Sequence, residues 1–142
     1  MEINHVLMPF QGTPDDEEAL RVLCRIVREF KAKLSLLCVV EVPLTHAVDA
    51  KDAPGLQEAE QIIERGEEIA SDCGVHVVTE VVKDREAGHA IVEQAKALGV
   101  NVIFMAVGHP KQPGGSYLGP NTEYVLKKAP CFVWVCRHPA RP

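Results

Sequence analysis

The stretch that decides the fold is residues 102–122, VIFMAVGHPKQPGGSYLGPNT. It opens with six apolar residues, which predict a buried strand, and continues into a loop that holds four of the chain's 10 glycines. Glycine lets backbone N–H groups approach an anion without a Cβ in the way, and a helix behind the loop adds its positive dipole end. Because open α/β sheets bind ligands at the carboxyl ends of their strands, this loop favours a phosphate cradle over a plain connector.

Strand and helix patterns alternate along the rest of the chain. Continuous apolar runs predict buried strands, and apolar residues at three- to four-residue spacing predict amphipathic helices. The predicted strands are 5–10, 34–40, 75–82, 102–107 and 131–136, and the predicted helices are 13–30, 56–73, 86–98 and 122–128. Thr13 and Thr122 are the expected N-caps of the first and last helices. The expected buried face of the first helix is Leu20, Leu23, Val27 and Phe30.

Five strands in strict alternation with four helices predict a three-layer α/β/α sandwich around a mostly parallel sheet. At 142 residues the chain, 1–142, is expected to form a single domain. Right-handed crossovers suit the doubly wound, Rossmann-like strand order 3-2-1-4-5, which places the first and fourth strands side by side. Their carboxyl ends then converge, so Gln11, Gly12 and Thr13 face the loop that starts at Gly108. This crevice is the expected ligand site.

The composition narrows the classes of function. A formal net charge of −5 argues against a nucleic-acid-binding surface. The five cysteines form no C-x-x-C motif and sit in apolar patterns, so we expect core residues in a reducing compartment. The six histidines are scattered, which predicts no metal site. No apolar run approaches membrane-spanning length, and we expect a soluble, cytoplasmic protein without membrane insertion.

Three segments carry a resemblance to a known family. These are VLMP at 6–9 followed by Gly12-Thr13, TEYVL at 122–126 and APCFV at 129–133. With them, the chain resembles the universal stress protein family over essentially its whole length. The resemblance implies a Rossmann-like fold of the adenine nucleotide alpha hydrolase type, binding of ATP or AMP, and a dimer through the last strand.

The chain departs from the nucleotide signature of that family. Gly108 and Gly119 match the first and third glycines, whereas Lys111 stands at the second and Pro120 replaces the following Ser or Thr. The loop is also two residues shorter. Lys111 is interpreted either as a solvated lysine or as a cation for phosphate. Gln11 replaces the usual aspartate and cannot coordinate Mg²⁺ as a carboxylate does, which leaves a role for Mg²⁺ open.

The crevice and the resemblance together define an expected nucleotide site. Its members are Pro9, Gln11, Gly12, Val39, Val107, Gly108, Lys111, Gly119, Asn121 and Thr122. By resemblance, Val39 would lie against adenine. The acidic residues 15–18 are interpreted as surface charges that interact favourably with the dipole of the first helix. They would repel a phosphate from that helix, so the phosphates are expected at the start of the last helix. Ser116 has no obvious base, and no catalytic residue is assigned, although slow nucleotide hydrolysis stays open.

The last strand suggests self-association. Phe132, Val133, Trp134 and Val135 are apolar residues at the predicted edge of the sheet, and bare edges invite pairing. We therefore expect a homodimer through this strand. The alternative to nucleotide binding is a degenerate family member that acts as a protein-interaction module with an empty cradle. The loop at 42–54 is similar to that of stress-protein domains associated with transporters, which implies a membrane transporter as a partner.

Overall fold

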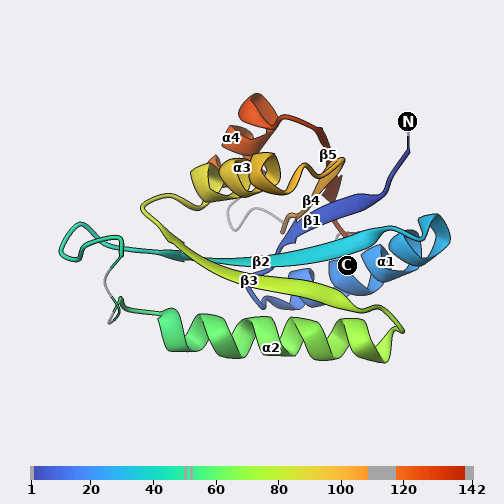
Figure 1. The fold of residues 1–142 in the computed structure, drawn as a ribbon, viewed down its shortest axis with the longest axis horizontal. Helices are drawn as coiled ribbons and strands as arrows, with labels where there is room; N and C mark the ends of the chain where they lie inside the picture. Colours follow the sequence, from blue (N-terminus) through green and yellow to red (C-terminus); the bar gives the residue numbers. More distant parts are fainter. Residues whose placement is uncertain (1, 50, 52, 109–117, 140–142) are drawn as a thin grey trace.

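The computed structural model contains one five-stranded sheet with helices on both faces (Figure 1). The structure describes residues 2–49, 51, 53–108 and 118–139. The strands are β1 (His5–Pro9), β2 (Lys33–Glu41), β3 (Val77–Asp84), β4 (Val102–Ala106) and β5 (Phe132–Cys136). The helices are α1 (Pro14–Phe30), α2 (Leu56–Asp72), α3 (Ala87–Leu98) and α4 (Pro120–Lys128). Every predicted element is present, with ends that differ from the prediction by at most two residues.

The strand order is β3-β2-β1-β4-β5, as predicted. Neighbouring strands of the described sheet pair in parallel, and the pairing of β1 with β4 brings Val6 opposite Val102 and Leu7 opposite Ile103. The nearly continuous apolar run of β2 is explained by its burial, because all seven residues between its two end residues are buried. The chain reverses its winding between β1 and β4, so the carboxyl ends of these two strands meet at the switch point of the sheet.

The two faces of the sheet carry separate cores. Helices α1 and α2 cover one face, and α3 and α4 cover the other (Figure 1). The α1/α2 core contains Phe10 and Leu23, and the core under α3 and α4 contains Leu7 and Ile91. Each strand thus sends alternate side chains to opposite cores, which fixes its register.

Two expectations about helix ends are wrong. Phe30 is 52% exposed because the chain turns at Lys31, whose φ is 54°, and goes straight into β2, leaving the last turn of α1 beyond the core. Thr122 is not the N-cap of the last helix. That helix starts at Pro120 with Gly119 as its N-cap, because proline with its fixed φ is favoured in the first helical position.

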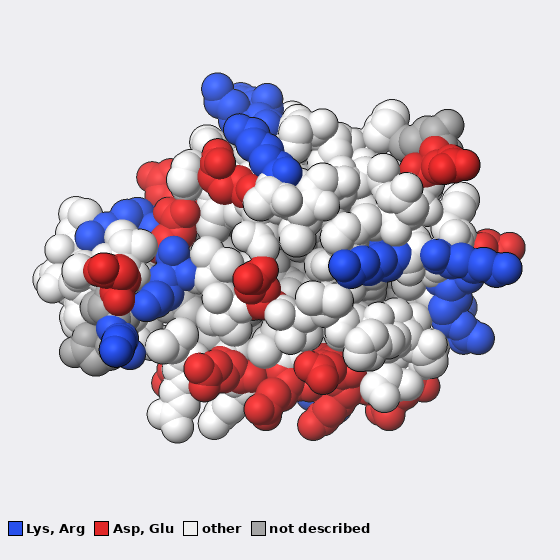
Figure 2. Space-filling view, in the orientation of Figure 1, with Lys and Arg blue, Asp and Glu red and all other residues white. Residues whose placement is uncertain are grey.

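Charge is unevenly distributed over the surface. Figure 2 shows acidic side chains gathered along α2. This helix carries six acidic residues against a single basic one, Arg65, which pairs with Glu17 and Glu68. The excess negative charge disfavours an anion on this face, so an anion site belongs elsewhere on the molecule.

Among the residues that the structure describes, none of the helices combines the length and apolar character that crossing a bilayer requires.

Candidate functional site

Two segments of the predicted site follow β1 and β4 and lie at the same edge of the sheet. Beyond Pro9, the N–H of Phe10 still donates to the carbonyl of Leu37 at 2.8 Å, so the pairing with β2 continues up to Gln11. Beyond β4, the N–H of Val107 donates to the carbonyl of Cys136 at 2.9 Å. Gln11 and Gly108 therefore follow directly on neighbouring strands, as the strand order predicted.

The Gln11 side chain lies over β2. Its Nε2 donates to the carbonyl of Val39 at 3.2 Å, and its Oε1 accepts from the Sγ of Cys38 at 3.2 Å. The Val39 side chain is 5% exposed and belongs to the core under α3 and α4. An adenine ring that hydrogen-bonds to the backbone of Val39 would therefore have to lie beside the Gln11 amide or displace it.

Gly12 is needed by the fold itself. Its φ is +78°, which disfavours any L side chain. A Cβ at this position would also lie 3.1 Å from the Cγ2 of Ile62 on α2. The glycine after Gln11 is therefore explained by the turn and by α2, without a ligand.

The start of α1 is closed by its own side chains. The Oγ1 of Thr13 accepts from the N–H of Asp16 at 3.0 Å, as its predicted N-cap role requires. Asp16 accepts the N–H of Gln11 at 2.7 Å and is only 8% exposed, and this burial raises the pKa of its carboxyl group. The interpretation of Asp16 as surface charge is therefore wrong. The Thr-x-x-Asp spacing, which resembles a capping box, was the available signal.

A second carboxylate of α1 faces the glycine that opens the predicted cradle. A Cβ on Gly108 would lie 3.0 Å from the Oδ2 of Asp15. The Oδ1 of Asp15 is hydrogen-bonded to the Nε2 of His138, and this contact raises the pKa of the imidazole. With Glu17, three carboxylates thus occupy the first turn of α1, which disfavours a phosphate there.

The start of α4 differs from that of α1. Gly119, the N-cap, has no side chain to accept from the first turn, and Pro120 contributes no N–H. The backbone N–H groups of Asn121 and Thr122 belong to this first turn, where a helix offers no acceptor of its own. The Thr122 side chain is 7% exposed. These groups form the kind of helix start that binds anions.

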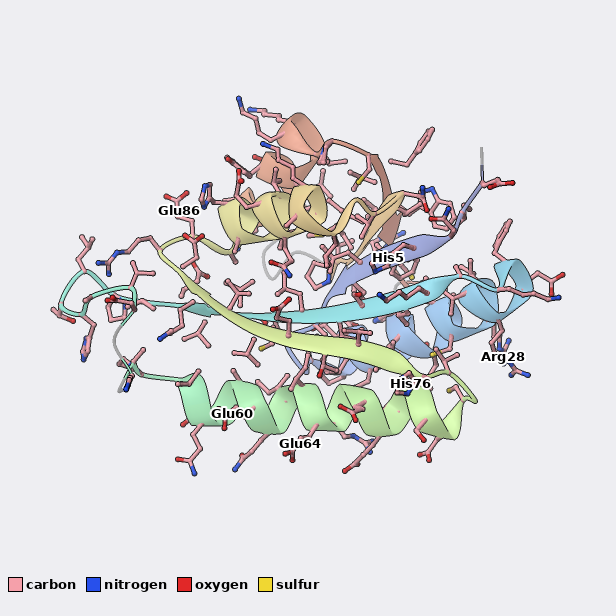
Figure 3. The ribbon with its side chains drawn as sticks, viewed as in Figure 1. His5, Arg28, Glu60, Glu64, His76 and Glu86 are labelled. Carbon is pink, nitrogen blue, oxygen red and sulfur yellow. The ribbon has the colours of Figure 1, made fainter. Side chains whose placement is uncertain are left out.

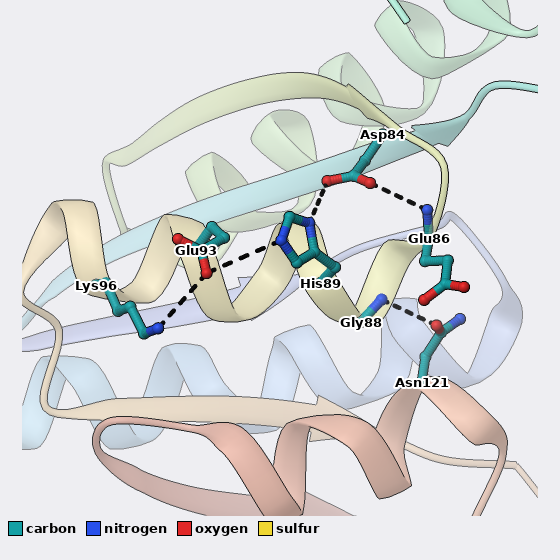
Figure 4. A network of polar contacts seen from close by, with 7 residues as sticks. All are labelled: Asp84, Glu86, Gly88, His89, Glu93, Lys96 and Asn121. Carbon is teal, nitrogen blue, oxygen red and sulfur yellow. Dashed lines mark hydrogen bonds and ion pairs between the residues drawn. The ribbon is translucent and has the colours of Figure 1, made fainter.

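Asn121 has a structural task that the sequence did not reveal. Its Oδ1 accepts from the N–H of Gly88 at 2.9 Å, and so it caps α3 from the neighbouring helix (Figure 4). A Cβ on Gly88 would lie 3.1 Å from the Cβ of Tyr124, so the two helices pack closely at their starts. Since α3 begins after the carboxyl end of β3, this contact holds the first turn of α4 at the same edge of the sheet.

A polar network continues along α3 (Figure 4). Asp84 accepts from the N–H of Glu86 at 3.1 Å and from the Nδ1 of His89 at 2.8 Å. The contact with Asp84 raises the pKa of His89. Partial burial works against the carboxylate form of Asp84, but the bonds from His89 and Glu86 prevail and lower the pKa of this carboxyl group. This network lies at the start of the helix predicted over residues 86–98.

The predicted site residues divide into three groups. Pro9, Gln11, Gly12, Val39, Val107 and Gly108 lie at or near the carboxyl ends of β1, β2 and β4. Gly119, Asn121 and Thr122 form the start of α4. Lys111 lies outside the described residues.

The fold is that of a doubly wound α/β domain, with the start of α4 at the carboxyl edge of its sheet. The chain belongs to the universal stress protein family, whose model matches residues 2–137. A search of curated protein sequences finds no match.

Solved structures share the fold. The universal stress protein UspA from Lactobacillus plantarum is 21% identical, with a TM-score of 0.73 over 96% of this chain and 99% of that one. A universal stress protein from Archaeoglobus fulgidus in complex with dAMP is 16% identical, with a TM-score of 0.75 over 95% and 98%. A universal stress protein in complex with cAMP is 16% identical, with a TM-score of 0.73 over 96% and 98%. At these identities the likeness shows the fold alone.

Proposed function

We propose that this chain is a regulatory domain that binds an adenine nucleotide at the carboxyl edge of β1, β2 and β4. The phosphate lies between Gly108 and the first turn of α4, and the base lies toward Val39. ATP and AMP are the candidate ligands. In this proposal the nucleotide acts as a signal and is not rapidly turned over.

The start of α4 is the observation that carries this proposal. Its first-turn N–H groups belong to Asn121 and Thr122, and a Cβ on Gly119 would meet no atom of the described residues within 4 Å. No described residue therefore fills the N-cap position that a ligand oxygen would take. The dipole of the helix adds favourable interaction with a negative charge.

The solved structures support the choice of ligand. Two family members of the same fold are described in complex with dAMP and with cAMP. Both ligands are adenine nucleotides with a single phosphate. AMP is therefore the first nucleotide to test.

The Gln11 side chain shapes the base-binding end of the proposed site. Its bond to the carbonyl of Val39 uses an acceptor that an adenine amino group would otherwise take. Gln11 also offers no carboxylate, and the proposal assigns Mg²⁺ no ligand at this position. We expect nucleotide binding that does not depend on Mg²⁺.

Thermal unfolding with ATP, ADP, AMP and cyclic AMP, each with and without Mg²⁺, tests the proposal. A ligand at a hundredfold excess over its Kd stabilises the folded state by about 2.7 kcal/mol. For a domain of this size the midpoint rises by about 4 °C or more. A rise with one adenine nucleotide, and none with inorganic phosphate, supports the proposal. No rise with any of the four nucleotides contradicts it.

A second candidate function, self-association, has an observation of its own. β5 is an edge strand, and Phe132 and Val135 on it are 57% and 43% exposed. We propose a homodimer that pairs through β5 and involves Phe132, Val133, Trp134 and Val135, and this surface serves equally a protein-interaction module with an empty cradle. Light scattering on the wild type and on Phe132→Glu tests it. A wild-type dimer that becomes a monomer in the variant supports the interface, and a monomeric wild type contradicts it.

A further inference from the structure

The segment 137–139, which follows β5 and is called the strap below, returns to the start of α1. It leaves the sheet beside Val107, whose N–H donates to the carbonyl of the last residue of β5 at 2.9 Å. The Nε2 of His138 is then hydrogen-bonded to the Oδ1 of Asp15 on α1. The other carboxylate oxygen of Asp15 lies 3.0 Å from the position of a Cβ added to Gly108. The strap and the proposed nucleotide site thus share one carboxylate.

Both ring nitrogens of His138 face hydrogen-bond acceptors. Nε2 faces the carboxylate of Asp15, and Nδ1 lies 3.1 Å from the carbonyl oxygen of Pro139. A neutral imidazole has one N–H and can donate to only one of them, whereas an imidazolium donates to both. The geometry therefore favours the charged form of His138. In agreement, the bond to Asp15 and then the bond to Pro139 raise the pKa of this imidazole.

Two other histidines make different contacts. The Nε2 of His5, at the start of β1 (Figure 3), lies 2.8 Å from the hydroxyl of Ser35. A hydroxyl can donate or accept, so a neutral imidazole satisfies this pair, and burial lowers the pKa of His5. His89 is bonded to Asp84 on the α3 side of the sheet (Figure 4), away from the strap, and provides a control.

A groove of about 240 Å³ lies between the strap and α1. Its charged lining residues are Asp15 and Glu18 from α1, which both raise the pKa of His138, and Arg137 and His138 from the strap. Cys136 also lines it, and burial and Glu18 raise the pKa of this thiol, so it is neutral near pH 7. Because the groove separates part of the strap from α1, we expect the position of the strap to depend on the bond from His138 to Asp15.

We infer that the strap is a pH-sensitive switch at the edge of the nucleotide site. Protonated His138 fastens the strap to α1 and neutralises Asp15, and loss of the proton weakens both effects. The consequence for the nucleotide rests on the proposed function, because Asp15 borders Gly108. Without the imidazolium, the carboxylate of Asp15 repels an anion placed there, so the site binds AMP more weakly above the folded pKa of His138 than below it.

NMR titration of the wild type tests the switch without a ligand, from about pH 5 to well above the folded midpoint. The His138 imidazole is expected to titrate above its ordinary value of 6.5, and the Gly108 amide to shift with the same midpoint. The heteronuclear NOE of the His138 amide should fall over this range as the strap loosens. In Asp15→Asn the midpoint is expected to fall toward 6.5. A midpoint that Asp15→Asn leaves unchanged, or a constant NOE, would overturn the inference.

Calorimetric titration with AMP, at one pH below that midpoint and one above it, tests the effect on the site. Because the phosphate of AMP also titrates, each variant is compared with the wild type at the same pH. His138→Gln is expected to bind about two- to fivefold more weakly at the lower pH and equally at the higher one. His138→Lys keeps a cation and should match the wild type at the lower pH and bind more tightly at the higher one. The control His89→Gln should match the wild type at both.

The two experiments separate the switch from the proposed function. If AMP binds and His138→Gln matches the wild type at both pH values, the link between the strap and the site is overturned while the proposed function stands. If AMP binds at neither pH, the proposed function fails, and the NMR titration decides whether the strap responds to protonation.

Discussion

Helices α1 and α4 both start at the carboxyl edge of the sheet, but their first turns are satisfied in opposite ways. At α1, Thr13 and Asp16 bond to nearby backbone N–H groups, and Asp15 pairs with His138. At α4, the N-cap is Gly119, and no carboxylate precedes Glu123 in the first turn. The first turn of α1 contains its own carboxylates, whereas the proposed site places an external anion at the first turn of α4.

In the proposed function, this difference favours the start of α4 over the start of α1 as the place for a phosphate. A carboxylate in the first turn takes the favourable interaction with the helix dipole that a ligand would otherwise gain. Asp15 lies next to Gly108, so negative charge also bounds the cradle on the α1 side. The proposed site therefore places the phosphate toward α4.

The largest expected effect comes from displacing α4. In Gly88→Val the added side chain meets the Cβ of Tyr124 and the carbonyl of Asn121, at 3.1 and 3.3 Å from the Cβ position. We expect a loss of about 1–3 kcal/mol in the free energy of unfolding, because the two helices have to move apart. Urea denaturation measures it. A change within the error of the wild type would show that α3 and α4 are not tightly packed at their starts.

Removing a side-chain acceptor at the start of α1 is expected to have the next largest effect on the free energy of unfolding. Asp16→Ala removes the acceptor of the Gln11 N–H in a buried position, and we expect a loss of about 1–2 kcal/mol. Asp15→Ala is the matched control, because this neighbour accepts from His138 and from no backbone group of the α1 start that is described here. Chemical denaturation of both variants tests the contrast. Equal losses would contradict the view that Asp16 closes the helix.

Asp15→Asn tests how the negative charge at the start of α1 affects AMP binding. Removing the carboxylate beside Gly108 is expected to strengthen AMP binding by about 0.5–1 kcal/mol, because a repulsive charge is lost. The pKa of His138 is expected to fall, since the bond to Asp15 is what raises it. Calorimetric titration measures the first effect and NMR titration of the imidazole the second. Weaker AMP binding in this variant would contradict the proposed position of the phosphate.

The smallest effect is the pH dependence of the pair Asp84 and His89. The raised pKa of His89 makes a contribution to stability that is full below its unfolded value of 6.5 and is lost as the pH rises through the folded value. The lowered pKa of Asp84 adds stability above its unfolded value of 3.8, and this is lost as the pH falls through the folded value.

His89→Gln tests this pH dependence of stability. The His89 side chain is 49% exposed, so we expect a loss of at most about 0.5 kcal/mol. The difference in midpoint between wild type and variant should be greatest between the two unfolded values and should shrink at alkaline pH. A difference that stays constant with pH would mean that the charge of the imidazole does not contribute.

The helices and strands were predictable because their signals are local, and the strand order followed from their strict alternation with right-handed crossovers. The apolar runs of β2 and β4 and the amphipathic spacing of α1 need no knowledge of distant residues. The missed features depend on tertiary contacts. Asn121 caps α3 only because α4 packs against Gly88, and Asp16 is buried only because the chain folds back at Gln11. Phe30 has the right spacing for the core but lies past the end of the sheet.

The most direct test compares AMP binding in two variants, one at each helix start. Thr13→Val removes only the capping hydroxyl of α1, and Gly119→Val adds a side chain at the N-cap of α4, where a Cβ meets no atom of the described residues within 4 Å. We predict that Thr13→Val loses about 0.5–2 kcal/mol of stability but keeps the wild-type Kd. Gly119→Val should keep its stability to within about 0.5 kcal/mol and bind AMP at least about tenfold more weakly. Wild-type affinity in Gly119→Val, with weakened binding in Thr13→Val, would contradict the assignment of the phosphate to α4.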